Sequence, residues 1–541
     1  MTGSRKPAEQ AEDVSKLSVE AGGEVAAGGS VRGSAAKFTR NSVMNVGRLL
    51  ISTAAGFVLP TFLIHRLPVT TYSAWVLILQ MSAYINYLDF GIQSGISKYV
   101  AEYDVRDDAV GLNMRASAGL ALLLIVSSIG VILTLALAWQ APHLFHEMPA
   151  GLYRDVRLGL IYVGVSTSFS LLCSIFASIF TGLQRFAVPT VLSTLNRLLF
   201  VAVVLIAVAL HSSLAMMGAG VAAVNVITGV LQFGAWRRYA RRVRLSLRGL
   251  DYGVLWKMVT FCSAIAVLTV AMLCISGLDV TLVGRYDFRQ TAFYSIASTP
   301  TNFIIGVMGA ALAPLLPSAS ALSVMRSPRQ MGELLAKATR YASTLLVVSG
   351  VVLLVGGYWL LRVWLGAEYA VQIVGYLRIL VVANVLRNMC APYANMLVAT
   401  DSQRIAIVGA TAEAVVNLGC SIYLARHIGA MGVAYGTLLG SFVGVGMHFG
   451  LSMHYTYAKL TISRVRLFLS GMGRPLMVVI PTALLAPRWW RDVAAAFSAP
   501  MWLAWAVSTL LLLWFVAIDA EERDSLVRVA ERRLRSLAAQ G

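Results

Sequence analysis

Long apolar runs recur along almost the entire chain, and they restrict its fold more than any other feature. A typical run has about 25 residues, which is enough to cross the roughly 30 Å hydrocarbon core of a bilayer as a helix. Hydrophobic residues make up 58% of the 541 positions and charged residues 13%, whereas a soluble domain carries about 25% charged residues. The sequence therefore predicts a polytopic integral membrane protein.

We expect these runs to be helices, because the edge of an open sheet leaves backbone groups without partners in lipid. Charges and turn residues separate fourteen runs, so the predicted fold is all-α with about 14 transmembrane helices. The predicted spans are residues 43–65, 73–100, 114–138, 156–181, 188–211, 217–236, 258–284, 290–322, 336–361, 373–398, 405–427, 430–453, 472–488 and 498–518.

Internal repeats relate the two halves of the chain. Four short motifs recur in order at offsets of 212 to 222 residues; Gly182 to Arg185, for example, is repeated as Asp401 to Arg404. A unit of six helices keeps its orientation in the membrane when it is repeated, because six is an even number. The sequence thus predicts two parallel six-helix lobes, residues 38–236 and 258–453, around a central cavity, followed by two C-terminal helices.

The segments outside the lobes are rich in charge. Residues 1–37 are predicted to be a disordered tail, and residues 454–518 to be a basic connection with the last two helices. In the linker at 237–257, apolar residues alternate with arginines, which favours a helix lying in the membrane interface. The tail at 519–541 is predicted to be an amphipathic helix in solvent or on the lipid surface.

Charge asymmetry predicts the orientation. Lysines and arginines number 28 on the side that carries both termini and 10 on the other, so both termini are expected in the cytoplasm. The formal net charge of +19 then belongs to loops that face anionic lipid, and we expect no nucleic-acid partner. The five cysteines are scattered through apolar runs, without a disulfide framework.

Several motifs near the start of the chain resemble the polysaccharide transporter family, which comprises O-antigen and exopolysaccharide flippases of the multidrug/oligosaccharidyl-lipid/polysaccharide exporter superfamily. The motifs are Arg40 to Asn45, Ile64 to Leu67 after Pro60, Tyr72 to Trp75, Asp89 to Ile92 and Lys98 to Tyr103. The resemblance implies a flippase that moves an undecaprenyl-diphosphate-linked oligosaccharide across the bacterial inner membrane for lipopolysaccharide or exopolysaccharide biosynthesis. It also implies membrane lipids, a polysaccharide polymerase and glycosyltransferases as partners.

Six ionisable residues lie well inside the predicted spans: Arg48, Asp89, Arg197, Asp279, Arg387 and Glu413. Each would cost about 2.5–3.5 kcal/mol if it faced lipid, so we expect them to face the bundle interior or water. One interpretation is that they pair with one another and lock helices together. The other is a hydrated cavity that accepts a pyrophosphate and sugars.

In the second interpretation the charges divide into two roles. Arginine suits phosphate because its planar guanidinium offers paired donors. The predicted substrate-binding residues are Arg48, Arg197, Arg387, Lys98 and Asn86, and the predicted ion-coupling residues are Asp89, Asp279 and Glu413. Lys98 lies near a helix end, where it could instead reach toward the lipid headgroups.

Arg197 and Glu413 are 216 residues apart, within the repeat offset, which predicts that they face each other across the axis between the lobes. Arg197 would then bind the anionic headgroup, and Glu413 would carry a coupling proton or pair with Arg197. The alternative is that each is satisfied within its own lobe.

Glycine and proline interrupt the runs at positions that could shape a cavity. Gly91 and Gly95 follow Asp89, where they are expected to let the second helix unwind or pack closely. Pro300 and Pro314 are expected to kink the eighth span.

We find no P-loop, no HExxH zinc motif and no nucleophile elbow, so we expect no enzyme activity and no cofactor, and energy from an ion gradient or the membrane potential. Two other functions compete with the flippase. One is a cation-coupled multidrug antiporter of the same superfamily. The other is a membrane-embedded polymerase or glycosyltransferase, which would need a large extramembrane loop bearing carboxylates.

Overall fold

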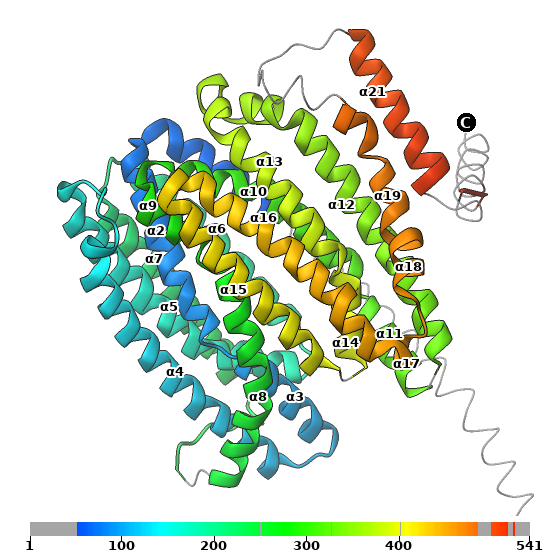
Figure 1. The fold of residues 1–541 in the computed structure, drawn as a ribbon. Helices are drawn as coiled ribbons and strands as arrows, with labels where there is room; N and C mark the ends of the chain where they lie inside the picture. Colours follow the sequence, from blue (N-terminus) through cyan, green and yellow to red (C-terminus); the bar gives the residue numbers. More distant parts are fainter. Residues whose placement is uncertain are drawn as a thin grey trace, which may run out of the picture.

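The computed structural model describes residues 51–248, 251–325, 327–400, 402–484 and 499–517, with three further residues near the C-terminus (Figure 1). Helices, turns and short irregular segments make up these residues, and no strand occurs among them. The predicted tail at 1–37, the family-like motif at Arg40 to Asn45 and Arg48 lie outside the described residues, as does nearly all of the tail at 519–541.

The first lobe begins with a helix over residues 51–66. It continues with α2 (Val69–Tyr87), α3 (Ile92–Val105), α4 (Ala109–Leu144), the short η1 (Ala150–Leu152), α5 (Tyr153–Gly182), α6 (Ala187–Ala209) and α7 (Leu214–Tyr239).

The second lobe begins with α8 (Tyr252–Met272), the π-helix η2 (Leu273–Gly277), α9 (Asp279–Tyr286), η3 (Phe288–Gln290), α10 (Thr291–Leu312) and α11 (Leu315–Val324). It ends with α12 (Pro328–Leu365), α13 (Ala367–Met389), α14 (Ala391–Ala399), α15 (Gln403–Ile428), α16 (Ala430–Met447), the π-helix η4 (His448–Ser452) and α17 (Met453–Leu460). Then follow α18 (Arg464–Leu467), η5 (Phe468–Gly473), α19 (Arg474–Met477), α21 (Ala499–Leu512) and η6 (Leu513–Ala517).

Nine helices of the described part are long and apolar enough to cross a membrane, or ten if a bent helix pair counts as one span. This confirms the all-α membrane fold. The number of fourteen spans stays a prediction.

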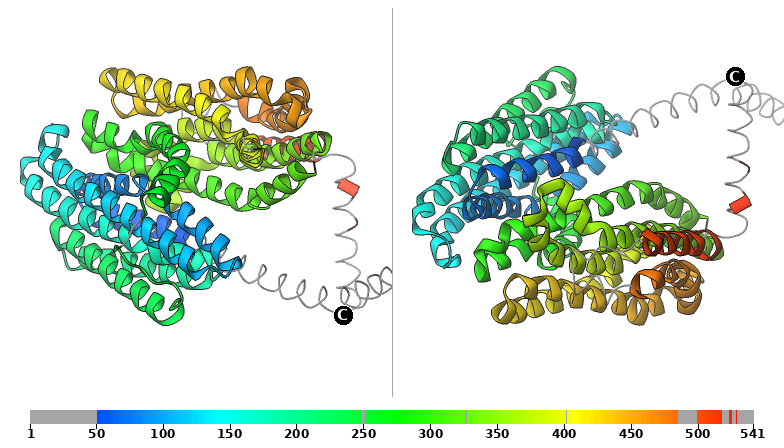
Figure 2. Two further views of the ribbon diagram at one scale, coloured as in Figure 1. Left: turned by 90° about the horizontal axis from the view of Figure 1, so that it is seen from below. Right: turned by 90° about the horizontal axis from the view of Figure 1, so that it is seen from above.

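The two lobes have the same arrangement of helices. In the first, α5 contacts α2, α4 and α7, and α6 packs on α7. In the second, α13 contacts α10, α12 and α16, and α15 packs on α16. Figure 2 shows the lobes as two layers, one blue to teal and the other green to orange. The predicted doubled architecture is therefore confirmed.

Among the described residues, the lobes share their largest hydrophobic core at one end. There, one cluster of buried residues includes Trp75 and Phe145 from the first lobe with Tyr294 and Leu361 from the second. At the opposite end, the buried residues form separate clusters, one around Ile96 and one around Leu335. The charge asymmetry of the sequence predicts that the shared core lies toward the outer side of the membrane.

Helix α8 links the lobes at the end where their cores are separate. Its first half packs on α3 and α4, and Val254, Met258 and Cys262 belong to the core cluster of the first lobe (Figure 1). The helix pair Tyr252–Ser263 and Ile265–Gly277 is bent by 41°. Beyond the bend, η2 and α9 pack on α15. One helix thus starts on one lobe and ends in the other.

The linker between the lobes differs from the prediction. The expected interfacial helix is wrong over residues 240–248, because α7 ends at Tyr239 and the chain then turns and continues without regular secondary structure. The backbone N–H of Arg244 donates to Asn113 Oδ1 at 2.7 Å, and that of Ser246 donates to Ser117 Oγ at 3.0 Å. Both partners lie on α4, so we call residues 240–248 the strap.

The second predicted span breaks between α2 and α3, as the glycines suggested. Phe90 and Gly91 both have positive φ, of 45° and 82°. A side chain at Gly91 would clash with Ile265 of α8, so this position needs glycine for conformation and for space. The predicted unwinding after Asp89 is confirmed, and it brings the break against α8.

A stripe of glycines joins α16 to α15. The stripe consists of Gly432, Gly436, Gly440 and Gly444, which are four residues apart and therefore share one helix face. A Cβ atom on each would clash, in order, with Leu424, Ser421, Asn417 and Glu413 of α15. These glycines let the two helices approach closely along the polar side of α15.

Candidate functional site

A polar pocket of about 400 Å³ lies inside the first lobe, between α2, α5, α6 and α7. Most of its polar groups are hydroxyls and amides: Ser82, Asn86, Thr167, Ser170, Ser193, Asn196, Asn225, Thr228 and Gln232. We call it the N-lobe pocket. Groups of this kind both donate and accept hydrogen bonds, which suits a ligand rich in hydroxyls.

Arg197 is the one charged residue among those that line the N-lobe pocket. Its Nε atom is buried and has no hydrogen-bond partner, and its guanidinium lies 5.4 Å from the centre of the Phe200 ring. Arg197 and Phe200 also line a second pocket of about 330 Å³, which reaches Ser295 and Thr299 of α10. A cation without a carboxylate partner therefore stands between the first lobe and the space between the lobes.

Hydrogen bonds hold the amides of the N-lobe pocket in place. Asn196 Nδ2 donates to Asn225 Oδ1 at 3.3 Å and to Thr228 Oγ1 at 3.1 Å. Asn225 Nδ2 in turn donates to Ser166 Oγ at 3.0 Å. This chain connects α6, α7 and α5, whereas the buried Gln232 Oε1 and Ser82 Oγ have no partner. Part of the polar lining is thus fixed and part is free to bind a ligand.

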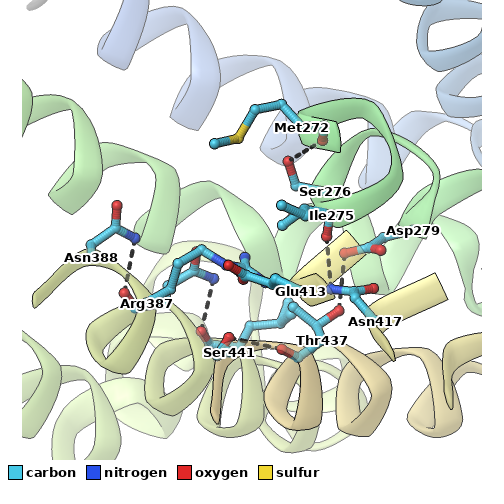
Figure 3. A network of polar contacts seen from close by, with 12 residues as sticks. Met272, Ile275, Ser276, Asp279, Arg387, Asn388, Glu413, Asn417, Thr437 and Ser441 are labelled. Atoms are coloured by element: carbon cyan, nitrogen blue, oxygen red, sulfur yellow. Dashed lines mark hydrogen bonds and ion pairs between the residues drawn. The ribbon is translucent and has the colours of Figure 1, made fainter. Parts of the chain in front are cut away.

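The second lobe holds a buried carboxylate, Asp279, at the first residue of α9 (Figure 3). Its side chain is 7% exposed. Its Oδ2 atom accepts hydrogen bonds from Thr437 Oγ1 at 3.1 Å and from the Tyr294 hydroxyl at 3.4 Å. Its Oδ1 atom is buried without a partner.

Asn417 and Ser421 extend this cluster along α15. Asn417 Nδ2 donates to the Ile275 carbonyl of η2 at 2.8 Å, and Ser421 Oγ donates to Asn417 Oδ1 at 3.4 Å. The donor set is one carboxylate with neutral oxygens, which are the ligands that hard cations prefer. The described part of the chain contains no group of three or more His, Cys, Asp or Glu residues that could hold a metal ion. A single negative charge suits a proton or a monovalent cation better than a divalent metal.

Arg387 of α13 and Glu413 of α15 form an ion pair next to this cluster (Figure 3). The Nε–Oε1 distance is 2.5 Å, and the side chains are only 15% and 9% exposed. The predicted encounter of Arg197 with Glu413 is therefore wrong, and Glu413 is satisfied within its own lobe, as the alternative interpretation expected. Arg387 Nη2 remains buried and without a hydrogen-bond partner.

The repeat offset explains this error. Where α6 and α15 begin, the matching residues are Arg185 and Arg404, which are 219 apart rather than 216. At that offset Arg197 corresponds to Val416, and Glu413 lies three residues before it, almost one helical turn away.

The remaining predicted site residues do not lie together. Asp89 Oδ1 accepts from the Gln93 backbone N–H at 3.2 Å, so it caps the first turn of α3 at the helix break. Lys98 is exposed, and its Nζ lies 4.5 Å from the centre of the Phe261 ring of α8. Asn86 is exposed and lines the N-lobe pocket. Arg48 lies outside the described residues.

Two buried arginines were not among the predicted site residues. Arg340 and Arg378 are 7% and 4% exposed. Both lie near the ends of the predicted spans 336–361 and 373–398, but the helices begin earlier, at Pro328 and Ala367. Their positions twelve and eleven residues into α12 and α13 place them well inside the bundle.

No family model matches the sequence, and neither does any curated protein. The fold is similar to that of a multidrug resistance MATE family transporter of the MOP superfamily in an inward-facing conformation, at a TM-score of 0.62 and 16% identity over 78% of this chain and 100% of that one. It is also similar to the lipid II flippase MurJ in an inward closed conformation, at a TM-score of 0.65 and 12% identity over 88% and 97% of the two chains. A MOP superfamily transporter from Pyrococcus furiosus gives a TM-score of 0.55 and 14% identity over 78% and 96%. At these identities the likeness establishes the fold, which is that of MOP superfamily transporters.

Proposed function

We propose that this chain, which has the fold of MOP superfamily transporters, is a flippase for an undecaprenyl-diphosphate-linked oligosaccharide in the bacterial inner membrane. The observation that carries this proposal is the N-lobe pocket, where hydroxyls and amides surround one arginine without a carboxylate partner. An oligosaccharide supplies many hydroxyls, and its diphosphate or an acidic sugar supplies the negative charge for Arg197.

The arrangement of the lobes supports alternating access. Both lobes belong to one core at the end assigned to the outside, where Ser73 Oγ accepts from the Ala292 backbone N–H at 3.2 Å and the Tyr369 hydroxyl donates to the Ile64 carbonyl at 3.3 Å. At the cytoplasmic end the cores are separate. A substrate made in the cytoplasmic leaflet would enter from this end.

The Asp279 cluster supports coupling to a proton or a monovalent cation. Asp279 is the first residue of α9, and Asn417 holds the carbonyl of Ile275 in η2, so an ion bound there contacts the segment that follows the bend of α8. The roles predicted for Arg387 and Glu413 in substrate binding and coupling stay predictions, because their ion pair satisfies both charges.

The N-lobe pocket argues against the cationic-drug antiporter. A cationic drug loses its hydration when it enters a pocket, and a carboxylate or an aromatic face must compensate for that loss. The residues that line the pocket include no Asp or Glu, and its one aromatic ring, that of Phe200, already lies 5.4 Å from the Arg197 guanidinium. A cationic drug would therefore be repelled by the one charge that the pocket holds.

A reconstituted assay tests the proposed function. Purified protein in liposomes should move a fluorescent undecaprenyl-diphosphate-linked oligosaccharide between leaflets, measured by its access to a membrane-impermeant quencher. Arg197→Ala should lower the rate at least about tenfold, since losing one charge-assisted contact costs about 1.5–3 kcal/mol, and Arg197→Lys should retain part of it. Arg238→Gln removes an exposed charge outside the pocket and should leave the rate unchanged. Absence of lipid movement by the unaltered protein, with uptake of a cationic drug instead, would contradict the proposal.

A further inference from the structure

A further pocket, which is cationic, lies at the end of α7, apart from the two pockets described above. It has a volume of about 600 Å³ and is lined by Trp236, Arg237, Arg241, Val243, Arg244 and Leu245. Three of these six side chains are arginines, the other three are apolar or aromatic, and none is acidic. We call it the arginine pocket.

The strap forms one wall of the arginine pocket and is firmly attached. Val243 is 1% exposed and belongs to the core of the first lobe. The residues on either side of Leu245 are held by backbone hydrogen bonds to Asn113 and Ser117 of α4. The wall is therefore part of the packed structure rather than a loose loop.

The arginines of this pocket lack carboxylate partners. Within the described part of the chain, the one acid bound to a strap arginine is Asp107, which pairs with Arg242 at 2.7 Å, and Arg242 does not line the pocket. Arg241 Nε donates to the Arg237 carbonyl at 3.3 Å, and Arg237 lies 5.8 Å from the centre of the Phe233 ring. Most guanidinium donors of the pocket remain available.

The length of α7 leads us to expect the pocket at the depth of the lipid headgroups. Helix α7 has 26 residues and is about 39 Å long, so its last turn extends beyond a hydrocarbon core of about 30 Å. Phe233 and Tyr239 on the same part of α7 are 47% and 53% exposed, as expected for side chains at a membrane surface.

We infer that the arginine pocket binds the phosphate of an anionic diacyl phospholipid in the cytoplasmic leaflet. Guanidinium groups bind phosphate oxygens through paired hydrogen bonds, and a lining with cations and no anions favours an anionic ligand. The apolar wall of Trp236, Val243 and Leu245 suits the glycerol and the first methylenes of a lipid, which a free phosphate lacks. The bound lipid braces the connection between the lobes.

Native mass spectrometry of the full chain tests this inference. The protein, exchanged into detergent with dioleoyl-phosphatidylglycerol or dioleoyl-phosphatidylcholine, should retain phosphatidylglycerol selectively. The triple variant Arg237→Gln, Arg241→Gln, Arg244→Gln should bind it more than about a hundredfold more weakly, since each charge-assisted contact between a guanidinium and the phosphate contributes about tenfold or more. A matched control, Arg238→Gln, Arg248→Gln, Lys257→Gln, removes three exposed charges outside the pocket and should bind as the unaltered protein does.

The outcomes separate the inference from its competitors. Equal losses in both triple variants would show attraction by net charge alone and overturn the site. Displacement of the lipid by excess inorganic phosphate would make the pocket a free-anion site and overturn the assignment to a phospholipid. Displacement by a polyprenyl diphosphate, but not by phosphate, would assign the pocket to the transported substrate instead. None of these results depends on transport, so the inference stands or falls separately from the proposed function.

Discussion

At the scale of single residues, the buried ion pair between Arg387 and Glu413 predicts how substitutions change the free energy of unfolding. Removing one partner leaves an uncompensated charge among buried groups, whereas removing both leaves an apolar contact. Arg387→Met and Glu413→Leu should each lower the free energy of unfolding by about 3–5 kcal/mol, and the double variant should lose far less than their sum. Thermal unfolding of purified protein gives the comparison. Additive losses would contradict a direct coupling of the two side chains.

Asp287, in the turn between α9 and η3, should make the stability of the folded protein depend on pH. Burial raises its pKa above the ordinary value of 3.8, the Ala430 N–H lowers it, and the charge of Glu147 raises it again. The folded protein thus binds this proton more tightly than the unfolded chain does. The stabilisation is complete below pH 3.8 and is lost as the pH rises through the raised pKa.

The substitution Asp287→Asn keeps an acceptor for Ala430 but cannot ionise. Its melting temperature relative to that of the unaltered protein should rise as the pH increases through that window, measured by a thermal unfolding series. Glu368→Gln, at an exposed carboxylate of α13, serves as the control. Parallel pH curves for the Asp287 variant and the unaltered protein would exclude this residue as the source of the dependence.

At the scale of elements, the glycine stripe of α16 predicts which glycines the fold requires. A Cβ at Gly436 meets the backbone of Ser421, so Gly436→Ala forces α15 and α16 apart and should cost about 1–3 kcal/mol. Gly446 lies on the same helix, and a Cβ added there would have no neighbour within 4 Å. Gly446→Ala should therefore be neutral or stabilising by up to about 1 kcal/mol. Unfolding in detergent measures both, and equal effects would remove the packing argument.

Some elements of the structure could be predicted from the sequence and others could not. The apolar runs located the helices because a bilayer sets their length, and the glycines after Asp89 located the break before α3. The strap was missed, although Val243, Leu245 and Leu247 alternate with polar residues at the period of two that indicates an extended chain. Its partners on α4 are 131 and 129 residues away in sequence, and no local pattern points to them.

The same limit applies to the candidate sites. Arg197 and Asp279 could be selected from the sequence because isolated charges in apolar runs are costly. The partner of Glu413 could not, because the choice between Arg197 and Arg387 depends on how the helices pack within one lobe.

At the scale of the whole molecule, the end at which the lobes share a core, predicted to be the outer end, must open if the lobes alternate. Ser73 and Ala292 approach each other there from opposite lobes. A disulfide in the double variant Ser73→Cys, Ala292→Cys should hold this end closed and lower lipid movement in liposomes at least about tenfold, and a reducing agent should restore it. Each single variant controls for the substitutions. Unimpaired movement with the cross-link formed would mean that the end with the shared core need not open.

Helix α8 limits how the two lobes can move. Two rigid bodies joined by a flexible tether could slide, twist and separate independently. Here α8 is anchored on α3 and α4 at its start, and η2 and α9 are anchored on α15 at the far end of the bend. Because this link is packed on both lobes, any rotation of one lobe against the other must change the bend of α8 or break its contacts with one of the lobes. Because Asn417 holds Ile275 on that link and Asp279 lies four residues further on, a change in the tilt of the lobes must also change the geometry of the Asp279 cluster.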